Sequence, residues 1–127
     1  MVNALDNAMI AARRAIESRY TGLCTVIERQ QVKDERTKVT SLKDVTVLSN
    51  CPCRLSYSSK KAVNQTDTAA SIDQTIVLFT APEIAIKAGS KVIVTQNGAT
   101  VEYKASGVPA VYETHQEVML ELFKEWA

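Results

Sequence analysis

The sequence predicts a mainly β protein, a small antiparallel β-barrel or rolled sandwich with an N-terminal α-helix and one long polar loop. Three observations lead to this prediction. Short segments with alternating apolar residues follow one another from residue 20 onward. The dipeptide Asn97-Gly98 separates two of these segments. The length, 127 residues, is that of one domain. We therefore expect a single domain over 1–127, with a helix in 1–19, a barrel in 20–127 and a loop at 58–70.

Composition limits the classes of function. The net charge is only +1, from 15 basic and 14 acidic residues, so overall charge does not drive the chain onto nucleic acid or acidic lipid. The odd number of cysteines, Cys24, Cys51 and Cys53, favours free thiols in a reducing compartment. No apolar run approaches the roughly 20 residues that span a bilayer. Because Asp6 interrupts the first apolar stretch, we expect no export signal and a soluble protein made in a cytoplasm.

Residues 2–19 have the pattern of an amphipathic helix. Their apolar side chains recur at spacings of three and four and form one stripe: Val2, Leu5, Met9, Ala12 and Ile16. Asp6 near the start and three arginines near the end suit the helix dipole. The preferred interpretation is a helix packed across the sheet. The alternative is a helix that docks on a neighbouring subunit.

The first half of the barrel should be a long ribbon followed by a short strand. Residues 20–31 and 38–48 carry β-branched runs on either side of a charged turn. Pro52 cannot donate to a strand ladder, so we expect a break at 49–52 and a separate strand at 53–58. Residues 58–70 then contain one large apolar residue, Val63, and no regular period. Loops of this length are functional or disordered, and the sequence leaves both open.

The second half is predicted around the Asn97-Gly98 turn. This dipeptide is typical of a two-residue type I′ hairpin, which sets Val94 opposite Val101 and Val92 opposite Tyr103. A further strand at 71–80 precedes it. Residues 116–126 fit either a strand or a helix, and we favour a strand over 116–122 because the sheet needs a closing partner. Trp126 would then lie in a loose tail or anchor a partner.

No chemistry stands out. The lone histidine, His115, has no neighbouring nucleophile in sequence, so we expect a structural role and no enzyme activity. The cysteine and histidine side chains that could bind zinc are Cys51, Cys53, Cys24 and His115. Their spacing does not form the paired motifs of a zinc site, so we predict no metal and no cofactor. The aromatic residues are scattered, and Lys60-Lys61 is the one short basic pair in the loop. A small β-barrel that binds single-stranded nucleic acid therefore remains an alternative.

Five segments in order resemble a known family: AARRAIESRYTGLCTV, CPCRLSYSS, SIDQTIVLF, APEIAIKAGSKVIVTQNGATVEYKASG and PAVYETHQEV. They resemble the minor capsid, or head–tail connector, proteins of siphophages of Gram-positive bacteria. Within this group the head-completion, or stopper, type is the most similar. The most telling pieces are 86–92 and 112–117. The resemblance covers nearly the whole chain.

The resemblance implies a ring between the portal and its adaptor on one side and the tail on the other, which retains packaged DNA and docks the tail. The partners implied are further copies of the chain, the portal–adaptor protein, a tail terminator or tail tube protein, and packaged double-stranded DNA, with no membrane. The protein would be assembled in the host cytoplasm and reside in the neck of the virion. An adaptor or a tail terminator is the alternative within the virion.

The same resemblance assigns residues by their place in the chain. A loop that projects into the channel would comprise Ser59, Lys60, Lys61, Ala62, Val63, Asn64, Gln65, Thr66, Asp67 and Thr68. Lys60 and Lys61 would contact the DNA backbone, an attraction that weakens with salt. Apolar residues near the two ends would dock on subunits or partners: Leu5, Met9, Ile16, Phe123 and Trp126.

Overall fold

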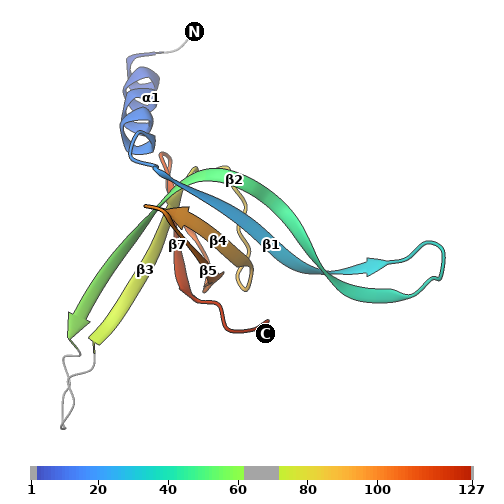
Figure 1. Ribbon diagram of the computed structural model, residues 1–127. Helices are drawn as coiled ribbons and strands as arrows, with labels where there is room; N and C mark the ends of the chain where they lie inside the picture. The colour runs from blue at the N-terminus through green and yellow to red at the C-terminus, as the bar shows by residue number, and fades with distance from the viewer. Residues whose placement is uncertain (1–2, 62–71, 127) are drawn as a thin grey trace.

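The computed structural model describes residues 3–61 and 72–126, which form one helix and seven strands (Figure 1). The elements in chain order are α1 (Ala4–Glu17), β1 (Gly22–Lys33), β2 (Thr40–Lys61), β3 (Ile72–Thr80), β4 (Lys91–Gln96), β5 (Ala99–Ala105), β6 (Ala110–Val111) and β7 (Gln116–Leu122).

The strands form one antiparallel sheet that closes on itself. Their order is β3-β2-β1-β4-β5-β7-β6, and a further pairing of β3 with β7 joins the two sides into a ring-like sheet. The prediction of a mainly β fold of the rolled-sandwich or small-barrel kind, with an N-terminal helix, is confirmed. The strand predicted at 116–122 is also confirmed, since β7 has these bounds and supplies the closing pair.

The core lies inside the ring because alternate residues of each strand point inward. In β4, Val92 and Val94 are buried, whereas Ile93 and Thr95 between and beside them are less covered. The fully or almost fully buried apolar side chains come from β1 to β5, β7 and the segment before β4: Cys24, Val26, Cys53, Leu55, Ile76, Leu78, Ile86, Val92, Val94, Tyr103, Ala105, Val118 and Leu120.

The central hairpin has the predicted register. Val94 pairs with Val101 and Val92 with Tyr103, while the outward pair Thr95 and Thr100 is joined by a hydroxyl–hydroxyl hydrogen bond of 2.8 Å. Asn97 and Gly98 both have positive φ, 53° and 76°, as a type I′ turn requires. A two-residue turn therefore sets the face of every side chain in β4 and β5.

The predicted break at Pro52 is wrong, because β2 runs unbroken for 22 residues. Thr80 Oγ1 donates a hydrogen bond of 3.0 Å to the Pro52 carbonyl oxygen, which places that carbonyl on the β3 edge. The N–H and C=O of one strand residue share an edge, so the proline nitrogen lies there too. The last β2–β3 pair is Cys53 with Thr80, so no ladder donor is needed at Pro52. Two register shifts in the β1–β2 pairing, one on each side of Val26, and a positive φ at Asn50 accommodate the local distortion.

The predicted loop begins too early. Residues 58–61 belong to β2 and pair with 72–75 of β3, Ser58 with Thr75 through Lys61 with Ile72. A polar sequence can pair in this way because the ladder is formed by backbone groups, which every residue except proline supplies in full. Residues 62–70 of the predicted loop lie outside the described residues.

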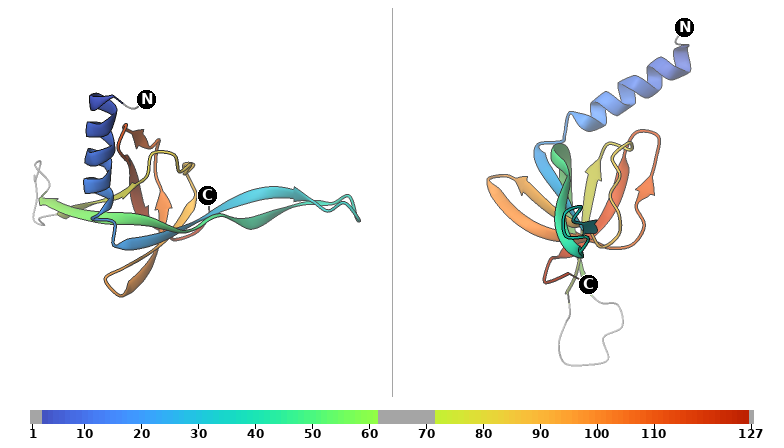
Figure 2. Two further views of the ribbon diagram at one scale, coloured as in Figure 1. Left: turned by 90° about the horizontal axis from the view of Figure 1, so that it is seen from above. Right: turned by 90° about the vertical axis from the view of Figure 1, so that its right-hand side faces the viewer.

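The preferred interpretation of the helix is also wrong. No residue of α1 is buried, and the helix extends away from the ring-like sheet and does not cross it (Figures 1 and 2). Its start has a capping box, in which Asn3 Oδ1 accepts the Asp6 backbone N–H at 2.8 Å. Arg13 forms a two-pronged ion pair with Glu83 in the segment between β3 and β4, with Nη2 and Oε2 2.7 Å apart. This pair and the last helical turn attach α1 to the sheet.

Candidate functional site

Two ribbons leave the ring-like sheet at opposite ends (Figure 1). On one side β1 pairs with β4 only from Leu23 to Ile27, so residues 28–33 have β2 residues 40–45 as their described partner. On the other side β3 pairs with β7 only from Ile76 onward, so residues 58–61 and 72–75 form a second two-stranded ribbon. The long strand β2 belongs to both ribbons and to the ring.

The β1–β2 ribbon, residues 28–45, has a polar surface with two exposed apolar side chains. Val39 is 59% exposed and Leu42 is 56% exposed. Its tip is a turn in which the Asp34 carboxylate accepts the backbone N–H groups of Arg36, at 2.8 Å, and Thr37, at 3.4 Å. A two-stranded ribbon is marginally stable in water by itself. Its length and exposed apolar residues suit contact with another chain.

The C-terminal aromatic residues pack at the base of this ribbon. The rings of Phe123 and Trp126 meet edge to face at 5.3 Å between centroids. The Arg29 guanidinium lies 5.8 Å from the Trp126 ring, and the Lys91 amine lies 4.8 Å from the Phe123 ring. Both predicted docking residues, Phe123 and Trp126, are thus partly covered by their own chain.

The second ribbon carries the start of the predicted channel loop. Ser59, Lys60 and Lys61 are the last residues of β2, opposite Gln74, Asp73 and Ile72. The remaining predicted loop residues, 62–68, lie outside the described parts of the chain. The structure therefore places the base of this segment, at the end of the sheet opposite the β1–β2 ribbon.

A groove of about 350 Å³ lies where α1 meets the sheet. It is lined by Ala15, Ile16, Arg19, Tyr20, Arg54, Phe79 and His115. The predicted docking residue Ile16 is half-buried here, whereas Leu5, 74% exposed, and Met9 lie farther along the projecting helix. Sequence reasoning missed Arg54 and Phe79 because only the fold brings β2 and β3 beside the helix end.

His115, just before β7, lies in a hydrogen-bonded environment. Its ring stacks on Tyr112 with centroids 4.9 Å apart. Nδ1 lies 3.1 Å from Thr114 Oγ1, and Nε2 lies 2.9 Å from Glu117 Oε2. These contacts hold the strand start of β7 beside the preceding turn.

The three cysteines are free, and Cys24 and Cys53 are buried in the core. A hydrogen bond with Cys53, together with burial, raises the pKa of the Cys24 thiol. Burial and the neighbouring Cys24 raise the pKa of Cys51. Among residues 3–61 and 72–126, no group of three or more His, Cys, Asp or Glu side chains is placed to hold a metal ion.

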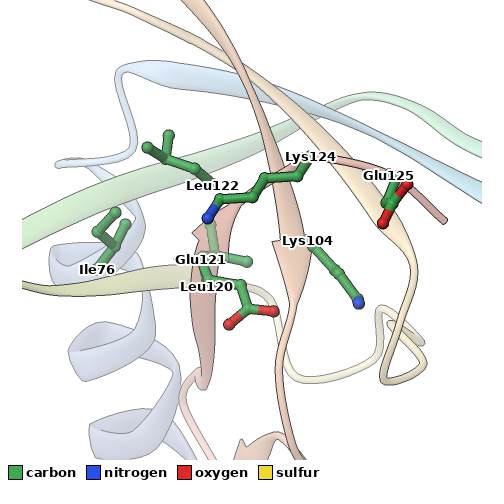
Figure 3. Close-up of a pocket in the computed structure, with 7 residues that line it drawn as sticks. All are labelled: Ile76, Lys104, Leu120, Glu121, Leu122, Lys124 and Glu125. Carbon is green, nitrogen blue, oxygen red and sulfur yellow. The ribbon is translucent and has the colours of Figure 1, made fainter. Parts of the chain in front are cut away.

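A second hollow, of about 510 Å³, lies over β7 and the segment after it (Figure 3). Its floor includes the buried Ile76 and Leu120, and its rim carries Lys104, Glu121, Lys124 and Glu125 beside the exposed Leu122. Equal numbers of acidic and basic groups select no particular charge. The hollow offers contact area and no recognisable chemistry.

The aromatic side chains do not form a platform for stacked bases. Tyr103 is buried, Tyr112 stacks on His115, and Phe123 packs on Trp126.

None of the helical chain that the structure describes has the length and apolar character needed to cross a membrane.

Comparison with known proteins adds one structural likeness. No protein-family model and no curated protein matches the chain. A solved structure, protein xkdH of the phage-like element PBSX from Bacillus subtilis, matches with a TM-score of 0.47 and 14% identity. The match covers 79% of this chain and 91% of that chain. No function follows from a likeness of this degree.

Proposed function

We propose that this protein is a structural component of a phage virion, and more specifically a stopper-type neck protein. In this role, copies of the chain form a ring between the portal–adaptor and the tail, retain the packaged DNA and give the tail a docking surface. The proposal starts from the ordered resemblance of five segments, of which 86–92 and 112–117 are the most telling.

The observation that carries the proposal is the pair of ribbons at opposite ends of one ring-like sheet. The ribbon of residues 58–61 and 72–75 leads into the segment that the resemblance assigns to the channel. We retain Lys60 and Lys61, at the last paired positions before that segment, as the candidates for DNA contact. The β1–β2 ribbon, extending the other way, would reach a neighbouring subunit, as a head-to-tail ring requires.

Electron microscopy of phage particles tests the proposal. A phage whose copy of this gene carries an early stop codon should yield emptied heads beside free, complete tails. The intact chain supplied from a plasmid should restore tailed, filled particles. Intact tailed particles from the mutant phage would contradict the neck assignment.

A further inference from the structure

We infer that α1 and the groove at its base form one docking trough for an acidic amphipathic helix of another protein. The trough consists of the apolar stripe of α1 (Leu5, Met9, Ala12 and Ile16) and the groove residues Arg19, Arg54 and Phe79. This inference goes beyond the neck assignment and holds whether or not the protein belongs to a virion.

The first argument is that α1 is an amphipathic helix with a partly uncovered apolar face, on which Met9 and Ile16 are half-buried and Leu5 and Ala12 are exposed. It has 14 residues, none buried, and Leu5 is 74% exposed. An isolated helix of this length is marginal in water, because most helical stability in proteins comes from packing of the apolar face. The helix nevertheless starts with a capping box, and the two-pronged ion pair of Arg13 with Glu83 fixes its position relative to the segment between β3 and β4.

The second argument is that the stripe continues into the groove. Ile16 lines the groove, and residues three or four positions apart lie on the same helix face. Ala12, Met9 and Leu5 therefore extend the wall that Ile16 begins. Phe79, from β3, also lines the groove at the base of the helix. An apolar strip flanked by a pocket is the geometry that accepts a partner helix with apolar residues at spacings of three and four.

The third argument is charge. Arg19, after α1, and Arg54, in β2, line the same groove from two different elements. No carboxylate of the described chain lines the groove, and two carboxylates next to lining residues have partners, Glu17 with Arg13 and Glu117 with His115. Within the described ranges, Arg19 and Arg54 form no salt bridge. Arginine pairs with carboxylates through two parallel hydrogen bonds, so acidic side chains complement this end of the trough.

The occupant is a protein segment and not nucleic acid, because most of the trough is apolar. A phosphate backbone needs hydrogen-bond donors or positive charge, and the side chains of Ala15, Ile16 and Phe79 have neither. The stripe of α1 adds more apolar area. A partner helix with apolar residues along its length and Glu or Asp at one end complements both the apolar strip and the two arginines.

Fluorescence anisotropy with the full chain and a labelled peptide tests the inference. The probe is a helical peptide of about 16 residues, built from Leu, Ala and Gln with Leu at spacings of three and four and two Glu at one end. It should bind saturably, and a scrambled peptide of the same composition should bind at least about tenfold more weakly. The double variant R19E/R54E should lose about tenfold or more in affinity for the Glu peptide.

Charge exchange makes the test specific. A peptide with Lys in place of both Glu should bind R19E/R54E more tightly than it binds the wild type. Met9→Ser should weaken the binding of both peptides. Circular dichroism of the variant chain checks that its helix content is unchanged. R36E, which makes the same kind of substitution once at the distant ribbon tip, should leave peptide affinity unchanged.

Several outcomes would overturn the inference. R19E/R54E could bind the Glu peptide as tightly as the wild type, or the scrambled peptide could bind equally well. A DNA duplex could displace the peptide at equal concentration, which would identify the ligand as nucleic acid. Self-association of the chain, abolished by Met9→Ser, would assign the trough to a second copy. None of these results bears on the phage stop-codon experiment, so the two proposals fail separately.

Discussion

Tyr103 is a buried phenol at the inner face of the ring. Its side chain is 2% exposed, and its hydroxyl lies 3.0 Å from that of Tyr57. Burial, and then the hydrogen bond with Tyr57, raise the pKa of Tyr103 to about 12. Because the pKa in the folded protein exceeds the usual value of about 10, the neutral phenol stabilises the fold fully below about pH 10. That contribution is lost as the pH rises through about 12.

We therefore predict a late alkaline transition in the tyrosine absorbance of the folded protein. Tyr103→Phe should remove this transition, and Tyr57→Phe should move it towards the usual range. The unfolded chain in denaturant is the reference, in which all four tyrosines should titrate together near pH 10. If every tyrosine of the folded wild type also titrated there, the burial of Tyr103 and its hydrogen bond with Tyr57 would be disproved.

Leu78 tests the core. It is fully buried in β3, so Leu78→Ala should lower the free energy of unfolding by about 2–5 kcal/mol, as measured by urea denaturation. Leu42→Ala is the matched control on the β1–β2 ribbon, where the side chain is 56% exposed, and should change it by about 0.5 kcal/mol or less. Equal losses for the two variants would contradict the assignment of the core to the ring.

At the scale of single residues, the sequence predicts much of the core but few of the contacts that define a site. Alternation and the Asn97-Gly98 turn are local signals, so they suffice to assign Val92, Val94 and Tyr103 to the inner face. The groove at the helix base depends on Arg54 and Phe79, which lie 35 or more positions from Arg19 along the chain. No local pattern connects residues so far apart.

At the scale of the elements, the β1–β2 ribbon should be less stable than the ring of the described sheet. Each of its strands has one described neighbour, whereas β4 lies between β1 and β5. Local opening costs least where backbone hydrogen bonds are solvent-exposed and few apolar side chains are buried.

Native-state hydrogen exchange of the isolated chain should show this difference. Amides of residues 28–33 and 40–45 should exchange faster than those of β4 and β5. Protection of the ribbon equal to that of β4 would mean that a further partner, such as a second copy, already covers it in solution.

Errors at this scale have a common physical origin. A proline is expected to end a strand because it lacks a backbone N–H. Pro52, however, lies on the β3 side just beyond the last β2–β3 pair, where the ladder needs no N–H donor. Residues 58–61, a polar sequence, are expected in a loop, yet their backbone pairs with residues 72–75 of β3. The amphipathic stripe of α1 is expected on the sheet, yet a stripe shows only that a helix has an apolar face. In each case the deciding neighbour is distant in sequence.

At the scale of the whole molecule, the class of fold follows from the sequence, but the shape does not. Length, alternation and turn residues predict a set of antiparallel strands and one helix, as the structure has them. The closure through β3 and β7, the two opposite ribbons and the projecting helix depend on pairings between distant segments (Figure 2). These three extensions give the chain more outward contact surface than a simple barrel of the same length.

The continuity of β2 has a mechanical consequence. Its 22 residues have a contour length of about 70 Å, and β2 supplies one strand to each of the two ribbons. A pull on the two ribbons in opposite directions runs along β2, so the β1–β2 and β2–β3 hydrogen bonds are loaded in shear and share the force. One continuous strand, β2, therefore transmits force between the two ribbons across the ring-like sheet.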